Sequence, residues 1–284
     1  MWPIRLPVQK DESLQSWLIR SAYALGLTPD DLVSIVLGKR LKIFDIDLDI
    51  TNEEIETLSG LSGMPQQHLF NATLSEFINS IAHLCSKNKY KWITTYLERK
   101  QKSRKVVFCP LCLSSDEVPY LRRRWRFAFE TYCTKHRILL IDRCTKCDYL
   151  FSVDDICLYD KTKLNCSNCG LKISKMKVND KLSLPRVCLY TKAMEPLIID
   201  NHSLTFFDKL HILITFLFAS HANFYFIRYL IKAEIPNIKK QYISHLKEIF
   251  FGNTNPIEKL SIEQRDVATR IATTLIMCYE KRFY

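Results

Sequence analysis

The chain has 284 residues, and its composition, with 47% hydrophobic and 25% charged residues, is that of a globular protein with room for two or three small domains. It contains six glycines and no G-x4-G-K-[ST] motif, which disfavours a turn-rich all-β fold and a Gly-rich nucleotide loop, so we expect no nucleotide hydrolysis by this chain. The formal net charge is +11 at pH 7.

This charge is unevenly distributed along the chain. Residues 1–86, here called the acidic head, carry a net charge of −5, whereas residues 87–126 carry +9 and residues 127–284 carry +7. A positive belt that begins near residue 87 is a candidate electrostatic footprint for nucleic acid. The alternative, for a lysine-rich chain, is a solvated helix surface.

The acidic head is predicted to contain two helical hairpins. Ser13 can cap a first helix that ends at Gly26, and Thr28 with Pro29 can begin a second helix. The pattern small–x3–Gly–x5–apolar is typical of a helix-turn-helix, and it recurs 37 residues later. Its residues are Ala22, Gly26 and Leu32 in the first hairpin and Ser59, Gly63 and Leu69 in the second.

The second helix of the first hairpin lacks the groups that usually read DNA. It offers Asp30 and Asp31, which would face phosphates unfavourably, where a recognition helix normally presents Arg, Lys, Asn or Gln. We therefore predict that the acidic head mainly docks a partner protein, with Trp2 and Trp17 as aromatic anchors.

Three aspartates, Asp45, Asp47 and Asp49, lie in alternation between the hairpins and are predicted to share one face of a short strand. A solvated strand edge is favoured over a divalent-ion site for these carboxylates. Residues 74–105 are then predicted to form one amphipathic helix that leaves a basic tail. The candidate nucleic-acid contacts of this tail are Lys102, Arg104 and Lys105.

Two sets of four candidate metal ligands follow between residues 109 and 169. In each set, two knuckles spaced C-x2-C or C-x2-H bring four ligands to one point, which is the tetrahedral arrangement of a structural zinc site. The first set is Cys109, Cys112, Cys133 and His136, and the second is Cys144, Cys147, Cys166 and Cys169. Both sets are complete and leave no open position, so we expect two structural zinc ions per chain that supply much of the folding free energy of these small modules.

A disulfide framework is the alternative use of the eleven cysteines. Such frameworks are typical of small secreted domains, whereas this chain is long and residues 1–8 lack the apolar segment of a signal peptide. The four cysteines outside the ligand sets are expected to be small buried residues: Cys85, Cys157, Cys188 and Cys278. Cys157 lies between the knuckles of the second set and is the one candidate competitor for a ligand position.

The densest positive cluster of the chain lies within the first ligand set. Arginines that are interleaved with aromatic residues suit phosphates or stacked bases, and we take them as candidate nucleic-acid contacts. They are Arg122, Arg123, Arg124 and Arg126, beside Tyr120 and Trp125. Alternatively, some of these arginines hold a helix at residues 125–132 against an acidic neighbour.

The remainder of the chain reads as helical, with predicted helices at 190–200, 204–220, 223–234, 238–251 and 260–282. Polar residues interrupt the uncharged stretch 210–227, so two buried helices joined near Ser220 are favoured over a membrane span. The expected fold class is mainly α with two small zinc modules. The predicted domains are an N-terminal helix-turn-helix region over 1–105, tandem zinc modules over 106–180, and a C-terminal helical domain over 181–284.

The motifs of this chain resemble those of the TniQ/TnsD family of bacterial transposon target-selection proteins. CPLC, YLRRRWRFAFETYCTKH and ILLIDRCTKC follow one another as the family's C-P-x-C, aromatic-basic stretch with C-x-x-H, and L-x-x-x-C-x-x-C do. The opening, with Leu6-Pro7, Glu12-Ser13-Leu14 and the segment 17–20, is similar to the family's N-terminal start. The resemblance covers about residues 3–175.

The resemblance implies a non-enzymatic, zinc-binding adaptor for DNA transposition in the bacterial cytoplasm. Such an adaptor links a target-recognition complex, which in some members is an RNA-guided CRISPR Cascade complex, to an AAA+ regulator of the TnsC type. For members of that kind, the resemblance implies a head-to-tail homodimer. We accordingly expect contacts with DNA or RNA and none with a membrane.

Two other functions are weighed against the adaptor. The first is a stand-alone sequence-specific DNA-binding protein that marks a transposon attachment site. The longer TnsD-like members carry a further C-terminal DNA-reading part, for which this chain is too short, so the resemblance favours the adaptor. The second is a zinc-dependent nuclease or hydrolase, which is disfavoured because both ligand sets are closed.

Overall fold

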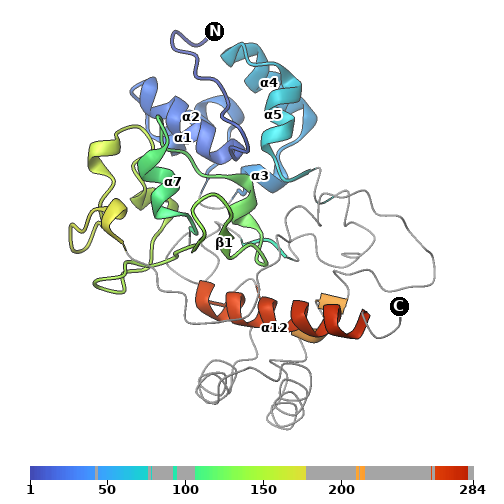
Figure 1. Ribbon diagram of the computed structural model, residues 1–284. Helices are drawn as coiled ribbons and strands as arrows, with labels where there is room; N and C mark the ends of the chain where they lie inside the picture. The colour runs from blue at the N-terminus through green and yellow to red at the C-terminus, as the bar shows by residue number, and fades with distance from the viewer. Residues whose placement is uncertain are drawn as a thin grey trace, which may run out of the picture. The chain divides into compact units, whose positions relative to one another are not determined.

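The computed structural model describes residues 1–41, 44–75, 78, 92–94, 106–176, 209–210, 212–214, 257 and 260–280 (Figure 1). The chain divides into two compact units, one formed by residues 1–127 with 140–178 and the other by residues 128–139 with 179–284. The described part is mostly helical, as predicted, and among its residues no helix is long and apolar enough to cross a membrane. The division into three domains stays a prediction.

The first predicted hairpin is present as α1 (Leu14–Ala24) and α2 (Pro29–Leu37). Ser13 caps α1 by accepting a hydrogen bond from the backbone N–H of Ser16, and Thr28 caps α2 by accepting one from the N–H of Asp31. The turn between the helices contains Gly26 at a φ of +73°, a left-handed conformation that glycine adopts without strain.

The second predicted hairpin is present as α4 (Asn52–Ser62) and α5 (Gln66–Ala72). Thr51 and Glu54 form a reciprocal capping box at the start of α4, and Gly63 ends this helix at a φ of +73°. The absence of a side chain at Gly63 also leaves room for the side chain of Arg5, because an added Cβ would lie 2.9 Å from Nη1 of Arg5.

The short strand predicted around the three aspartates is wrong. Residues Ile46–Asp49 form a helical turn, α3, with Asp45 as its N-cap residue. Apolar and acidic residues alternate here without facing opposite sides, because Ile46, Asp47 and Leu48 are all buried. The solvated edge predicted for Asp45 and Asp47 is therefore also wrong, since both carboxylates lie inside the protein.

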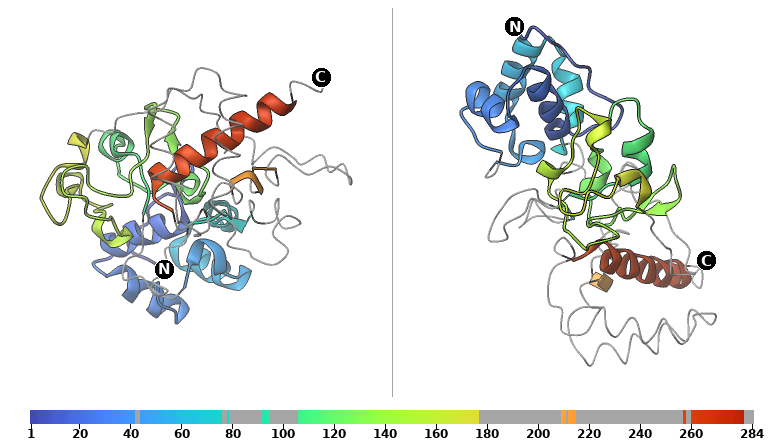
Figure 2. Two further views of the ribbon diagram at one scale, coloured as in Figure 1. Left: turned by 90° about the horizontal axis from the view of Figure 1, so that it is seen from below. Right: turned by 90° about the vertical axis from the view of Figure 1, so that its left-hand side faces the viewer.

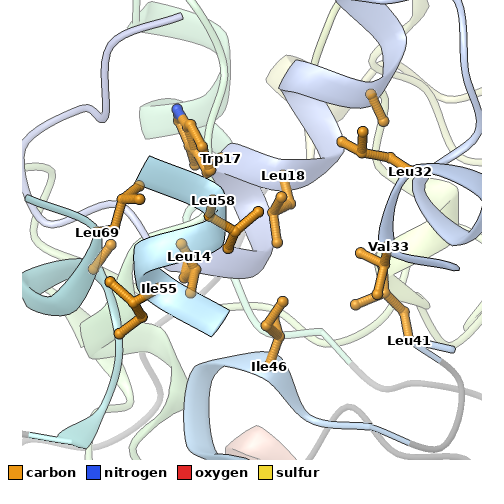
Figure 3. Packing of buried hydrophobic residues seen from close by; sticks show 12 residues of the cluster. Leu14, Trp17, Leu18, Leu32, Val33, Leu41, Ile46, Ile55, Leu58 and Leu69 are labelled. Atoms are coloured by element: carbon orange, nitrogen blue, oxygen red, sulfur yellow. The ribbon is translucent and has the colours of Figure 1, made fainter. Parts of the chain in front are cut away.

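One hydrophobic cluster holds the helices of the acidic head together (Figure 3). Side chains from α1, α2 and α4 meet in it, and Leu14, Trp17 and Leu58 are completely buried there. The other labelled members are Leu18, Leu32, Val33, Leu41, Ile46, Ile55 and Leu69. Burial of a single side chain of this size contributes roughly 1.5–3 kcal/mol, so the cluster contributes strongly to the stability of the acidic head.

The helix predicted over residues 74–105 does not continue through residues 92–94. Trp92 has a φ of +70°, and Ile93 forms an isolated antiparallel bridge with Phe127. The backbone N–H of Thr94 donates to the carbonyl of Arg126 at 2.7 Å. The predicted basic tail, with Lys102, Arg104 and Lys105, lies outside the described residues.

The central region contains short elements. Its single α-helix among the described residues is α7 (Pro110–Ser115), and its one two-stranded sheet pairs β1 (Tyr132–Cys133) with β2 (Ile138–Leu139) in antiparallel register. Four 3-10 turns complete it: η1 (Arg123–Arg126), η2 (Val153–Asp155), η3 (Lys161–Lys163) and η4 (Ile173–Lys175). The helix predicted at residues 125–132 is absent, because the 3-10 turn η1 ends at Arg126 and β1 begins at Tyr132.

In the second unit, α12 (Ile262–Glu280) is one unbroken helix and confirms the last of the predicted C-terminal helices (Figure 2). Asp266 on this helix accepts a hydrogen bond from Thr131 Oγ1 at 2.8 Å and lies 3.3 Å from Nη1 of Arg270. The other predicted C-terminal helices, at 190–200, 204–220, 223–234 and 238–251, lie wholly or mostly outside the described residues.

Candidate metal centres

The first ligand set comes together as predicted. Cys109 is the N-cap residue of α7, and its sulfur accepts the backbone N–H of Cys112 at 3.4 Å. Cys133 ends β1, and its sulfur accepts the N–H of His136 at 3.4 Å while lying 3.6 Å from Nδ1 of that histidine. The four ligand atoms all lie within 4.8 Å of one another, and we call this group the first tetrad.

The second ligand set forms a second tetrad with the same compactness. The sulfurs of Cys144 and Cys169 are 3.6 Å apart, and those of Cys147 and Cys166 are 3.7 Å apart. All four sulfurs lie within 4.8 Å of one another. These distances exclude disulfide bonds, whose sulfurs are about 2.05 Å apart. They fit a zinc ion, because a tetrahedron with Zn–S bonds of about 2.3 Å places its sulfurs about 3.8 Å apart.

Three of the four knuckles share the same tight backbone turn. The residue four positions after the first cysteine takes a left-handed conformation: Arg137 at a φ of +54°, Asp148 at +58° and Gly170 at +68°. In each case its N–H donates to the carbonyl of that cysteine, at 2.7, 3.0 and 2.9 Å respectively. The chain therefore reverses immediately after each knuckle, and the two side-chain ligands of the knuckle point to one side of the turn.

Two cysteines of the second tetrad have thiol pKa values that are shifted in opposite directions. The side chain of Asn168 and the backbone N–H of Tyr149 hydrogen-bond the Cys147 sulfur and lower the pKa of its thiol to about 6. Burial raises the pKa of Cys166 to about 12. Zinc binds thiolates, so a metal ion is the group that would keep both sulfurs ionised at neutral pH. The two tetrads thus hold two zinc ions per chain, each with four protein ligands and no open position.

Cys157 is not part of either tetrad. We expect Cys157→Ser to retain two zinc ions per chain, because its sulfur is not among the ligand atoms gathered at the second site. Elemental analysis of the purified variant gives the stoichiometry directly. A fall to one zinc ion in folded protein would instead place Cys157 in the coordination sphere.

Arg126, a candidate nucleic-acid contact, is completely buried and binds two carboxylates. Its Nη2 lies 2.6 Å from Oδ2 of Asp45, its Nη1 lies 2.5 Å from Oδ2 of Asp47, and its Nε donates to the carbonyl of Thr94 at 2.9 Å. We call Arg126, Asp45 and Asp47 the buried ion cluster. The guanidinium does not face solvent, so Arg126 binds acidic residues of the chain itself, which is the alternative to a nucleic-acid contact given above.

The buried ion cluster carries one cation against two carboxylates. Burial raises the pKa of Asp47 to about 6, against the opposing effect of Arg126 and with added repulsion from Asp45. Asp47 Oδ1 also accepts the backbone N–H of Gln15 at 2.8 Å, which connects the cluster to α1. No local pattern could have revealed this cluster, because Arg126 lies 81 residues from Asp45 and 79 from Asp47.

The other three arginines of the positive cluster also contact acidic residues. Arg122 donates to both carboxylate oxygens of Asp116 at 3.0 and 2.9 Å, and its guanidinium lies over the rings of Tyr120 and Trp125. Asp11 lies 3.6 Å from Nε of Arg123 and 3.2 Å from Nε of Arg124. The side chains of the three arginines are 12%, 16% and 26% exposed in chain order, so little of this positive charge faces solvent.

The candidate partner contacts of the acidic head are divided between core and surface. Trp17 is completely buried, donates its Nε1–H to the carbonyl of Leu6 at 2.8 Å and stacks on the half-buried Trp2 with ring centroids 5.7 Å apart. Asp30 accepts the N–H of Leu41 at 3.1 Å, whereas Asp31 is exposed on the first turn of α2. The most exposed apolar residue of α2 is Ile35, at 72%, which is not among the partner contacts predicted from the sequence.

Residues 3–140 match the family model described as TniQ, a span that includes the acidic head from residue 3 onward, the buried ion cluster and the whole first tetrad. The second tetrad lies beyond the matched residues. No curated protein sequence matches the chain.

Proposed function

We propose that this chain, which contains a TniQ family domain over residues 3–140, is a non-enzymatic adaptor that links a target-recognition complex to an AAA+ transposition regulator of the TnsC type. The TniQ family implies a transposition target-selection protein, and its members are non-catalytic transposition factors. The finer parts of the proposal are a CRISPR Cascade complex as the recognition complex and a homodimer as the working form.

The observation that supports an adaptor is the outward face of α2. Asp31, Ser34 and Ile35 are exposed on this face, and Ile35 is 72% exposed. A DNA-reading helix in a helix-turn-helix presents cationic or amide side chains to phosphates and base edges. An exposed aliphatic side chain beside a carboxylate instead suits a protein partner, so the structure of α2 favours docking over DNA reading.

The charge of the acidic head favours a basic partner surface. Four carboxylates of the acidic head are bound to arginines: those of Glu12, Asp45 and Asp47 are buried, and that of Asp11 is partly exposed. The exposed carboxylates that remain on α2 and α4 include Asp31, Glu53 and Glu56. A basic partner surface complements them, and such charges chiefly set orientation and association rate, while Ile35 supplies apolar contact.

The other proposed contacts stay part of the same function. Lys102, Arg104 and Lys105 are still proposed to meet nucleic acid, as are Arg122, Arg123 and Arg124 through the exposed fractions of their side chains. Arg126 is left out because its side chain is 0% exposed. Trp17 is likewise left out of the proposed docking surface, because it is a core residue.

We expect Ile35→Ser to weaken docking to the purified recognition complex and to the ATPase by about tenfold or more, because loss of one apolar anchor costs roughly 1.5–3 kcal/mol. Zinc content and thermal stability should stay unchanged, since the side chain is 72% exposed. Pull-down and light scattering on the full chain would measure docking and dimerisation.

Ile4→Ser is the matched control, because Ile4 is also an exposed isoleucine of the acidic head, at 46%. A chain with Ile35→Ser that docks as well as the unaltered protein would contradict the proposal. Loss of duplex DNA binding with docking intact would favour the stand-alone DNA-binding protein instead.

A further inference from the structure

Two tyrosines from distant parts of the sequence meet at the surface of the first compact unit. Tyr23 lies near the end of α1, and Tyr159 lies between η2 and η3 in the region of the second tetrad. Their ring centroids are 4.1 Å apart with an interplanar angle of 35°. Tyr23 is 38% exposed and Tyr159 is 51% exposed, so the pair keeps a large aromatic surface open to solvent.

Exposed lysines accompany this tyrosine pair. Lys163 places its Nζ 5.8 Å from the ring centroid of Tyr159, and its side chain is 65% exposed. Lys161 is exposed on the same 3-10 turn, η3. Asp160 contacts two residues of this turn: its Oδ2 forms an ion pair with Nζ of Lys163 at 3.5 Å, and its Oδ1 accepts hydrogen bonds from the backbone N–H and the hydroxyl of Thr162.

A purely structural role does not account for these features. Lysines that balance the negative charge of a zinc-thiolate centre are expected beside its ligands, as Lys146 and Lys172 are in the sequence. Lys161 and Lys163 lie on η3, which contributes no ligand to the tetrad. Packing of α1 against this region would be served by buried aliphatic residues, and it does not require two rings that are a third to a half exposed.

We infer that Tyr23, Tyr159, Lys161 and Lys163 form a contact site for an unpaired segment of nucleic acid. One base stacks on the exposed ring of Tyr159, which the contact with Tyr23 holds in place, and the two lysines bind the adjoining phosphates. In a duplex the faces of the bases are covered by neighbouring bases, so only an unpaired base can offer its face to an aromatic side chain. Two exposed lysines beside an open aromatic ring favour this ligand over a protein.

This site extends the proposed function, because an adaptor at a target-recognition complex would thereby also contact nucleic acid. It does not depend on docking through α2, and its test needs no partner protein. The zinc-loaded full chain is titrated against a fluorescein-labelled 20-nucleotide oligothymidine, an oligouridine of the same length and a 20-base-pair duplex, at several salt concentrations, with fluorescence anisotropy as the readout.

Tyr159→Ala should weaken binding of both single strands by about tenfold, the effect expected for removal of one base–aromatic stack, and should change duplex affinity little. Tyr159→Phe keeps the ring and should bind within about twofold of the unaltered chain. The double variant Lys161→Ala, Lys163→Ala should reduce the log–log salt slope for single strands by about 1.4, or about 0.7 for each phosphate that the protein no longer neutralises. The double variant Lys10→Ala, Arg40→Ala removes two exposed cations of the acidic head and should leave this slope unchanged.

Three results would overturn the inference: no measurable binding of single strands by the unaltered chain, equal single-strand affinity in Tyr159→Ala, or a weakening in Tyr159→Phe as large as that in Tyr159→Ala. Each variant is first shown to hold two zinc ions and to melt as the unaltered chain does. A chain with Tyr159→Ala that fails to bind single strands but docks normally would support the site by itself. If Ile35→Ser fails to dock but still binds single strands, the inferred contact site is supported independently of docking through α2.

Discussion

Cys133→Ser is expected to reduce the zinc content from two ions per chain to one and to unfold the region around the first tetrad. Cys133 is 6% exposed and provides one of the four ligands. The strands beside it have two residues each, too short to be stable without the metal. Structural zinc contributes roughly 10–16 kcal/mol in peptides of this kind, which equals or exceeds the total stability of a typical domain.

Elemental analysis and thermal melting of the purified variant would measure both effects. Cys157→Ser is the matched control, because it makes the same chemical change at a cysteine outside both tetrads. A Cys133→Ser chain that keeps two zinc ions, or that loses one and still melts as the unaltered protein does, would contradict a structural role for the first tetrad.

The second large effect is expected at the buried ion cluster. Arg126→Met should lower the free energy of unfolding by about 3–5 kcal/mol, because it leaves two buried carboxylates without their cation. The loss is large for a mutation at a site without metal, since Asp45 and Asp47 are both 0% exposed on the side chain. Urea unfolding of the zinc-loaded protein, with midpoint and slope compared, would measure it.

Arg143→Ala is the control for this prediction. Arg143 also lies near two carboxylates, Asp142 and Asp148, but its side chain is 40% exposed, so its removal should cost less than about 1 kcal/mol. Adding Asp45→Asn and Asp47→Asn to Arg126→Met removes the stranded charges and should restore part of the lost stability. If Arg126→Met costs no more than the control, the guanidinium is not the counter-charge of these carboxylates.

The parts of the fold that could be predicted are those fixed by neighbours in the sequence. Ser13, Thr28 and Thr51 cap helices because a side-chain oxygen reaches a backbone N–H only three residues away. The zinc ligands are predictable for the same reason, because each knuckle is set by a spacing of three residues, and only the pairing of knuckles is long-range.

The errors arise where burial depends on distant residues. Asp45 and Asp47 fit a strand edge by alternation, but a single turn of helix buries them equally well once Arg126 is present. Helical periodicity places Trp17 on an apolar face, yet periodicity does not say whether that face is covered by the chain itself or by a partner. The net charge of a segment also does not show which charges face solvent. Asp11, for example, forms an ion pair with Arg124.

These contacts also change how the acidic head should be tested. Deletion of residues 1–86 would remove Asp45 and Asp47, the two carboxylates that bind the buried guanidinium of Arg126. Such a truncated chain would fail through instability whatever the head binds. Single substitutions at exposed positions such as Ile35 separate docking from folding, which the deletion does not.

The separation of 79 to 81 residues within the buried ion cluster has a consequence for synthesis on the ribosome. Asp45 and Asp47 leave the exit tunnel well before Arg126, by about 4–16 s at translation rates of roughly 5–20 residues per second. During that interval the helices of the head can assemble their apolar side chains, but the two carboxylates have no cation to bury against. The N-terminal region therefore reaches its final packing only after the segment that carries Arg126 has been made, and its maturation is timed by residues that follow it in the chain.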